Sequence, residues 1–232
     1  MRRLLARIPK AITWRLERLR HFFYNSREVV FWAGEGKDAA WYPDLDKLAA
    51  VGRAIGLQAR QANPADLELF ARYHAGCGRP LKPRRIRKML RRWQEDCSCY
   101  IALDAAGEII CYIWVAFRDL YVEDISRVFE VGARDALLFD LETRADRHGS
   151  MGFAAASCAA LVEINQRGRD RIVAWSTPAQ FEQFRRFHWW TGLGELKPLH
   201  LERCTAVCGL KFRKVTPLAE DHTFEFSSRT AK

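Results

Sequence analysis

The stretch from Asp140 to Gly152 holds the residue types best suited to chemistry, where an apolar strand meets a helix. Its loop carries two glycines and a serine, so several backbone N–H groups can point at one spot beside the positive end of the helix dipole. Such a turn suits phosphate oxygens, with glycines allowing close approach and basic side chains adding charge or donors. The candidate anion-binding residues are Arg147, His148, Gly149, Ser150, Met151 and Gly152. The spacing fits neither a P-loop nor a dinucleotide fingerprint, and a tight connection without a ligand is the alternative.

The elements that must position this loop follow from apolar periodicity and turn residues. Strands are predicted at 28–34, 99–103, 108–117, 136–143, 172–175, 201–210 and 212–215, with a hairpin turn at Asp104–Gly107. Helices are predicted at 43–57, 63–73, 81–95 and 152–166, and a further one begins at Pro178. Asn63 is the expected cap of the second helix. The buried stripe of the third is expected to consist of Ile86, Met89, Leu90 and Trp93. This order predicts a mixed, mostly antiparallel α/β sheet of six to seven strands with helices on both faces.

Charge points to an anionic partner. The 232 residues include 38 Lys plus Arg against 28 Asp plus Glu, a formal net charge of +10. Residues 1–23 read as a basic amphipathic helix interrupted near Pro9, either an anchor on anionic lipid or a helix packed on the main domain. The basic run of 81–95 is either a solvated face or a surface that meets an anion.

Other classes of protein are disfavoured. No segment is long and apolar enough to cross a bilayer, and the N-terminus lacks the pattern of a secretory signal. Seven cysteines, an odd number in a long chain, favour reduced thiols in the cytoplasm. The pairs Cys97/Cys99 and Cys204/Cys208 do not have the spacing of a zinc knuckle, so no metal is expected. No RNA-recognition motif is present, so nucleic acid is a poor candidate for a partner.

The chain resembles the GNAT acyltransferase superfamily. The pyrophosphate loop of that superfamily reads Arg/Gln-x-x-Gly-x-Gly/Ala between a strand and a long helix. The segment from Arg147 to Gly152 matches the frame at its first and last positions, with Ser150 at the middle glycine and an additional Gly149. The order of elements from about residue 56 to 215 carries the resemblance further. It implies an N-terminal extension (1–55), an acyltransferase domain (56–215) and a tail (216–232).

The resemblance implies an acyl-CoA cosubstrate, acetyl-CoA being the conservative expectation. The loop amides would hold the pyrophosphate, and the strand residues Leu141, Glu142 and Thr143 would pair with the pantetheine arm. The acyl carbonyl would lie where this strand splays from the next one, near Trp175. An amine or hydroxyl of a small molecule, sugar or lipid precursor would attack it directly, which requires positioning, a base and oxyanion donors.

The base is predicted among two carboxylates and a histidine. Asp140 and Glu142 alternate onto one face of the strand, so both could reach the acceptor. Glu142 is the preferred candidate because it is nearer the implied reacting end, with Asp140 and His188 as further candidates. The alternatives are an ion pair or exposure for Glu142 and a structural hydrogen bond for His188. Many members of the superfamily have a proton-donating tyrosine where this chain has Phe184, which cannot donate.

Two function classes remain from the sequence. The first is the acyltransferase, with an acyl carrier protein as an alternative donor and the inner membrane surface as a site of peripheral contact. The second is a non-catalytic module that binds anionic lipid or another polyanion through residues 1–20 and 82–92.

Overall fold

The computed structural model describes residues 24–35, 56–122, 127–147, 151–187, 195–207 and 210–218. The strands in these ranges are β1 (Tyr24–Glu35), β2 (Gln58–Ala62), β3 (Cys97–Leu103), β4 (Ile109–Ala116), β5 (Leu120–Val122), β6 (Arg127–Phe129), β7 (Asp135–Thr143), β8 (Arg171–Ser176), β9 (Lys197–Val207) and β10 (Leu210–Pro217). The α-helices are α3 (Leu67–Gly76), α4 (Pro83–Gln94), α5 (Gly152–Gln166) and α6 (Pro178–Phe187), with 3-10 turns η2 (Pro64–Asp66) and η3 (Ala145–Arg147).

The main sheet has the strand order β10-β9-β1-β8-β7-β4-β3-β2, and β5 and β6 form a separate ribbon. Every neighbouring pair in the main sheet is antiparallel except β7 and β8, which run parallel and are joined through α5. The predicted mixed, mostly antiparallel α/β class is confirmed. The predicted six to seven strands are too few, because the main sheet alone contains eight.

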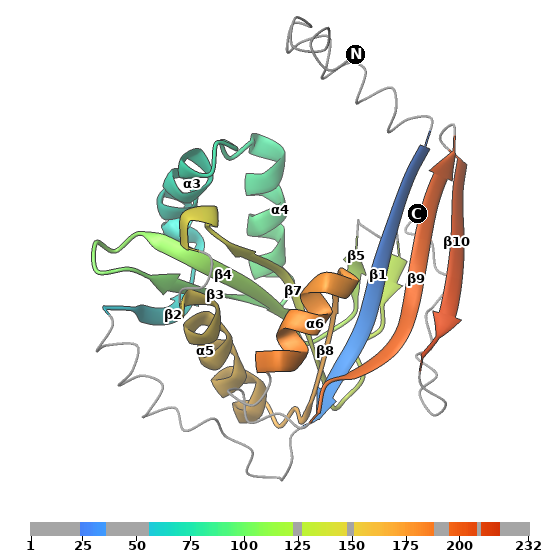
Figure 1. Ribbon diagram of the computed structural model, residues 1–232. Helices are drawn as coiled ribbons and strands as arrows, with labels where there is room; N and C mark the ends of the chain where they lie inside the picture. The colour runs from blue at the N-terminus through green and yellow to red at the C-terminus, as the bar shows by residue number, and fades with distance from the viewer. Residues whose placement is uncertain are drawn as a thin grey trace, which may run out of the picture.

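The main-sheet strand that the sequence did not predict is β2, which lies at one edge of the sheet. The predicted strand 28–34 lies within β1. β1 pairs with β8 on one side and β9 on the other, so Phe31 lies beside both Trp175 and His200. Part of the segment expected to be an N-terminal extension is therefore an interior strand (Figure 1). The predicted helix at 1–23 lies outside the described residues, as does 43–57 except for Gly56 and Leu57, which are not helical.

Local chemistry explains the elements that the sequence predicted correctly. In the β3–β4 hairpin, the Asp104 carboxylate accepts hydrogen bonds from the backbone N–H groups of Ala106 and Glu108, and Gly107 takes a φ of +76°. Asn63 caps η2 in a reciprocal capping box with Asp66, and α3 follows directly. Thr177 and Gln180 exchange the equivalent bonds at the start of α6, with Pro178 at its first position.

The helices lie on opposite faces of the sheet, α3 and α4 on one and α5 and α6 on the other (Figure 1). An apolar cluster fills the space on each face. On one face, Phe70 and Tyr73 of α3 and Met89 of α4 pack on Tyr112 and Trp114 of β4. On the other face, α5 and α6 cover the sheet, with Ala156, Ala160, Leu161, Ile164 and Phe181 fully or almost fully buried. No helix among the described residues is long and apolar enough to cross a membrane.

Candidate active site

A β-bulge interrupts β7 at Asp140. The register against β4 shifts by one residue between the pairs Tyr112↔Glu142 and Trp114↔Phe139, which leaves one additional residue in β7. Asp140 adopts a φ of +45°, a left-handed conformation that aspartate tolerates better than most side chains. The bulge therefore lies inside the segment that the sequence singled out.

The bulge reverses the faces of the residues that follow it. Leu138 and Leu141 both pack against the α5 side, whereas Phe139 and Glu142 belong to the α4 side. Simple alternation would have put Glu142 with Leu138, on the α5 side. Asp140 and Glu142 were predicted to share a strand face by alternation. Both form ion pairs with α4, through Arg92 and Arg85, and the bulge brings Glu142 to that side.

β7 and β8 part next to the bulge. Their parallel pairing runs from Asp135↔Arg171 to Leu138↔Ala174 and then stops. The next residues, Phe139 and Trp175, stack with ring centroids 6.2 Å apart and an interplanar angle of 14°. A cavity of about 560 Å³ opens here, within the size range of small-molecule sites.

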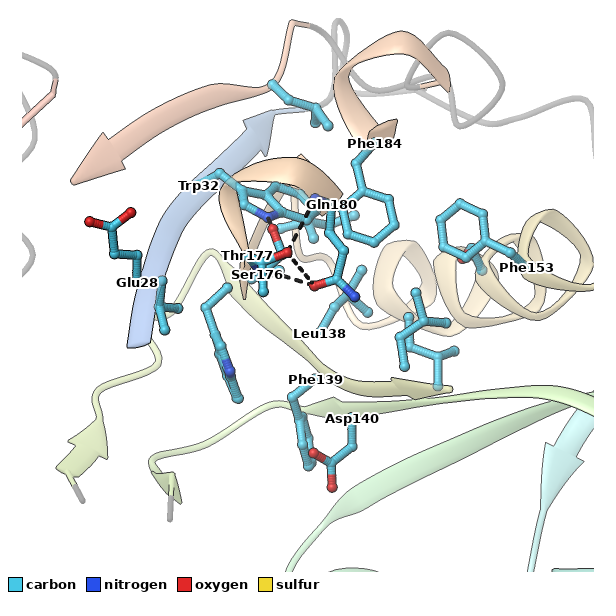
Figure 2. Close-up of a pocket in the computed structure, with 18 of the residues that line it drawn as sticks. Glu28, Trp32, Leu138, Phe139, Asp140, Phe153, Ser176, Thr177, Gln180 and Phe184 are labelled. Atoms are coloured by element: carbon cyan, nitrogen blue, oxygen red, sulfur yellow. Dashed lines mark hydrogen bonds between the residues drawn. The ribbon is translucent and has the colours of Figure 1, made fainter. Parts of the chain in front are cut away.

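The cavity reaches both faces of the sheet through this opening (Figure 2). On the α5/α6 side, Trp32, Phe153 and Phe184 form an aromatic wall, with centroids 5.7 Å apart for Trp32 and Phe184 and 5.3 Å for Phe153 and Phe184. On the α3/α4 side, Trp175 and Cys204 line it. The walls are mainly apolar.

Few polar groups line this space. The Trp32 indole donates to Ser176 Oγ at 3.2 Å, and Thr177 and Gln180 bond each other at the start of α6 (Figure 2). Ser157 of α5 is 4% exposed, and its hydroxyl has no hydrogen-bond partner among the described residues. A buried hydroxyl without a partner is costly to stability.

Asp140 lines the cavity and is held by Arg92. The Arg92 guanidinium lies 2.6 Å from the Asp140 carboxylate and is 8% exposed. Its carbon lies 4.7 Å from the centroid of the Phe139 ring and 5.1 Å from that of Trp114. Cation–π contacts on two rings and an ion pair fix this arginine beside the bulge.

Glu142 belongs to a second, neighbouring network. Arg85 Nη2 donates to Glu142 Oε1 and to the Tyr112 hydroxyl, both at 2.6 Å, and Arg79 lies 3.5 Å from the other carboxylate oxygen. Glu142 is not among the residues that line the cavity. Of the two predicted carboxylates, Asp140 is therefore the one on the cavity wall, and Glu142 has the arginine partner that was its alternative.

His74 lies under the same network. It is 1% exposed, and neither ring nitrogen has a hydrogen-bond partner in the described structure. Burial, with the charges of Arg85 and Arg79 close by, lowers the pKa of His74 to about 4. The imidazole is therefore neutral at physiological pH.

The residues expected to hold the cosubstrate are described in part. Leu141 lines the cavity, and the Thr143 hydroxyl donates to Cys111 Sγ at 3.3 Å. Arg147 ends η3, and Met151 precedes Gly152, the buried first residue of α5. Met151 provides no side-chain cap to α5. His148, Gly149, Ser150 and His188 lie outside the described residues.

The cysteines in the described ranges are free thiols. Burial raises the pKa of Cys97 to about 11 and the pKa values of Cys111 and Cys158 to about 12, so these thiols stay protonated. The described part of the chain contains no group of three or more His, Cys, Asp or Glu side chains that could hold a metal ion.

The sequence analysis missed the inward arginines of α4. Arg85, Met89 and Arg92 are four and three residues apart, so they share one helix face, and this spacing was a readable signal. It was hidden by the basic residues on the rest of the helix. The roles of Trp32 and Ser157 had no such signal, because they depend on tertiary packing.

Comparison with known proteins addresses the fold. No family model and no curated protein matches the sequence. Among solved structures, a GCN5-related glucosamine N-acetyltransferase region of a fungal multidomain GH3 β-N-acetylglucosaminidase matches with a TM-score of 0.54 at 12% identity. The match covers 89% of this chain and 23% of that chain.

Two further solved structures match a shorter part of the chain. An acetyltransferase from Trypanosoma brucei has a TM-score of 0.41 at 12% identity, covering 56% of this chain and 90% of its own. An aminoglycoside 6′-N-acetyltransferase from Acinetobacter baumannii has a TM-score of 0.42 at 12% identity, covering 58% and 89%. The match that covers 89% of the chain agrees with the strand order, the bulge in β7 and the opening between β7 and β8. The conclusion that rests on it is that this chain has the fold of the GCN5-related N-acetyltransferases.

Proposed function

We propose that the protein is an acyltransferase that moves an acyl group from a pantetheine thioester to an amine or hydroxyl acceptor. The observation that carries the proposal is the cavity of about 560 Å³ that passes through the opening between β7 and β8. A donor and an acceptor can enter such an opening from opposite faces and meet at the bulge. This arrangement converts an encounter of two molecules into a reaction within one complex.

The donor enters from the α5/α6 side. The pairing of β7 with β8 ends before the bulge, so the backbone of Leu141 and Glu142 can bond the amides of the pantetheine arm. Arg147 ends η3 and Gly152 begins α5, and the start of a helix favours the pyrophosphate of CoA. The cosubstrate is thus acyl-CoA, or an acyl carrier protein with the same arm.

The reaction is a direct displacement. The acceptor nucleophile attacks the thioester carbonyl, a bond to the acyl carbon forms, and the C–S bond then breaks. The nucleophile gives its proton to a carboxylate on the acceptor side, and the thiolate takes a proton from water. Phe184 stands on the cavity wall and supplies no proton.

Asp140 and Glu142 have separate parts in this proposal. Asp140 lies on the cavity wall and is the candidate to accept the proton, with its carboxylate oriented by Arg92. Glu142, the candidate that the sequence favoured, lies behind it and aligns Arg85 and Tyr112. His188 remains a candidate from the sequence.

The test is a thiol-release assay with acyl-CoAs against panels of amines, amino sugars and hydroxylated acceptors. We expect release of CoA to require an acceptor. Its rate should fall at least a hundredfold in Asp140→Ala but less than tenfold in Glu142→Gln. Acceptor-dependent release that is unchanged in Asp140→Ala would remove Asp140 from the mechanism. No binding of CoA or of any pantetheine thioester would overturn the function.

A second function is favoured by one observation. Arg84, Arg87 and Arg91 of α4 and Lys82, which precedes it, are exposed, so this helix keeps a basic outer surface although Arg85 and Arg92 point inward. A polyanion-binding module would use that surface, and its affinity would fall steeply with salt. Binding of anionic vesicles that disappears when these four residues are replaced, without any binding of CoA, would favour it over the enzyme.

A further inference from the structure

The cavity continues beyond the place where a pantetheine arm would end. In the proposed function, on which this inference rests, the arm lies along the part of β7 after the bulge. Yet Ile172 of β8 and Leu161 of α5 also line the cavity. Ile172 pairs with Ala136, two residues before the last β7–β8 pair, so this branch lies beneath α5 and over the closed part of the sheet.

The branch is long and apolar. Phe153, Ser157 and Leu161 follow one another at four-residue spacing and form a stripe of about 12 Å along α5. On β8, the stretch from Ile172 to Ser176 runs for about 13 Å. The side chains at the closed end, Leu161, Ile172, Ile113 and Leu196, are each at most 3% exposed.

Such a space is unusual inside a packed domain. Protein interiors have few voids larger than a water molecule, and apolar cavities stay dry and take apolar guests. The chemistry of the walls is graded along the space. Ser176, Thr177 and Gln180 lie together at the start of α6 (Figure 2). The unpartnered Ser157 is on the middle of the α5 stripe, and the closed end is formed by apolar side chains.

We infer that the donor carries an unbranched acyl chain several methylenes longer than acetyl, which lies in the branch beneath α5. The thioester carbonyl, where polar arm and apolar chain meet, can accept a hydrogen bond from Ser157. An acetyl group would leave the branch empty, so the complex would lack the free energy gained by burying apolar surface there. The specificity therefore differs from the acetyl transfer that the resemblance implied.

Titration calorimetry of the full chain with CoA and with acetyl-, butyryl-, hexanoyl-, octanoyl- and lauroyl-CoA tests this inference without any acceptor. The dissociation constant should fall roughly fourfold for each added methylene until the branch is full. A parallel series on acyl carrier protein identifies which carrier presents the chain. Tighter binding of the octanoyl form on either carrier supports the inference.

Leu161→Phe narrows the branch without touching the opening, and Gln166→Phe places the same ring on the exposed end of α5 as a matched control. The affinity ratio of octanoyl-CoA to CoA should drop at least tenfold in the first variant and stay within twofold in the second. If Leu161→Phe does not fold, the chain-length series of the unmodified protein decides alone. If CoA binds but the dissociation constant does not change with acyl-chain length, this inference is overturned and the proposed acyltransferase function stands. If no thioester binds, both the inference and the proposed function are overturned.

Discussion

The two faces of β7 on either side of its bulge have opposite chemistry. Toward α4, Asp140 and Glu142 meet Arg92 and Arg85, each at 2.6 Å. Toward α5, Leu138 and Leu141 meet apolar side chains and a cavity. A single additional residue in the strand separates a face of ion-paired carboxylates from an apolar, partly unfilled one.

This difference shows how one strand can serve two substrates. The apolar face offers space and little charge, which suits the thiol arm and acyl chain of a donor. The charged face offers oriented carboxylates, which suit an acceptor that must lose a proton. Because the bulge also ends the pairing with β8, the two faces communicate at the point where the reaction would take place.

The largest effect should come from removing the arginine beside the bulge. Arg92→Leu leaves the Asp140 carboxylate without its partner and should lower the free energy of unfolding by roughly 3–5 kcal/mol in urea denaturation. Arg91→Leu, on the exposed side of the same helix, should cost less than about 1 kcal/mol. Equal losses in the two variants would show that the buried pair does not hold the bulge.

The charged face should also make the free energy of unfolding depend on pH, by an amount comparable to the loss expected in Arg92→Leu. Since the pKa of His74 is about 4 in the folded state against 6.5 for the free side chain, the unfolded chain binds more protons between these values. Stability is then full above pH 6.5 and falls as the pH drops toward 4, by roughly 3 kcal/mol from this residue. His74→Phe should remove this part of the slope in urea titrations, whereas Tyr73→Phe should keep it. Identical slopes in the original protein and His74→Phe would contradict the assignment.

The apolar face should respond differently at two positions of α5. Ala160 packs tightly against the sheet, so Ala160→Leu should cost roughly 1–3 kcal/mol through overpacking. Ser157 lines the cavity, so Ser157→Leu should stay within about 1 kcal/mol, because it fills space and removes an unpartnered hydroxyl. Thermal unfolding of both variants checks the difference. A loss in Ser157→Leu as large as that in Ala160→Leu would mean that the space beneath α5 is closed.

The smallest effect should come from an exposed ion pair far from the bulge. Arg72 of α3 pairs with Glu108 at 3.0 Å while 47% exposed, so Arg72→Ala should cost less than about 1 kcal/mol, and less still in high salt. Urea denaturation at two salt concentrations measures it. A cost near that of Arg92→Leu would erase the contrast between surface and buried pairs.

Local signals in the sequence predicted much of the framework. The Asp104–Gly107 turn, the Asn63 cap and the apolar strand and helix around the loop depend on residues close in the chain, and all are confirmed. The interior position of β1 depends instead on pairing with residues such as Trp175 and His200, far away in sequence. No local pattern reports such pairing.

The candidate site was predicted less completely than the framework. The segment was correct, but the bulge was not foreseen, since an aspartate with positive φ has no distinctive neighbours in sequence. Its consequence, the reversal of faces for Leu141 and Glu142, could not follow from alternation alone. The pairing of Arg85 and Arg92 was obscured because α4 is basic on every side.

Hydrogen exchange of the backbone amides with and without bound CoA tests most directly whether the gap between β7 and β8 receives the donor. Slower exchange is predicted in residues 138–143 of β7 and in the first half of α5, with β2 and β3 unchanged. Protection confined to the outer side of α4, or bound CoA that leaves β7 and α5 unprotected, would contradict the account.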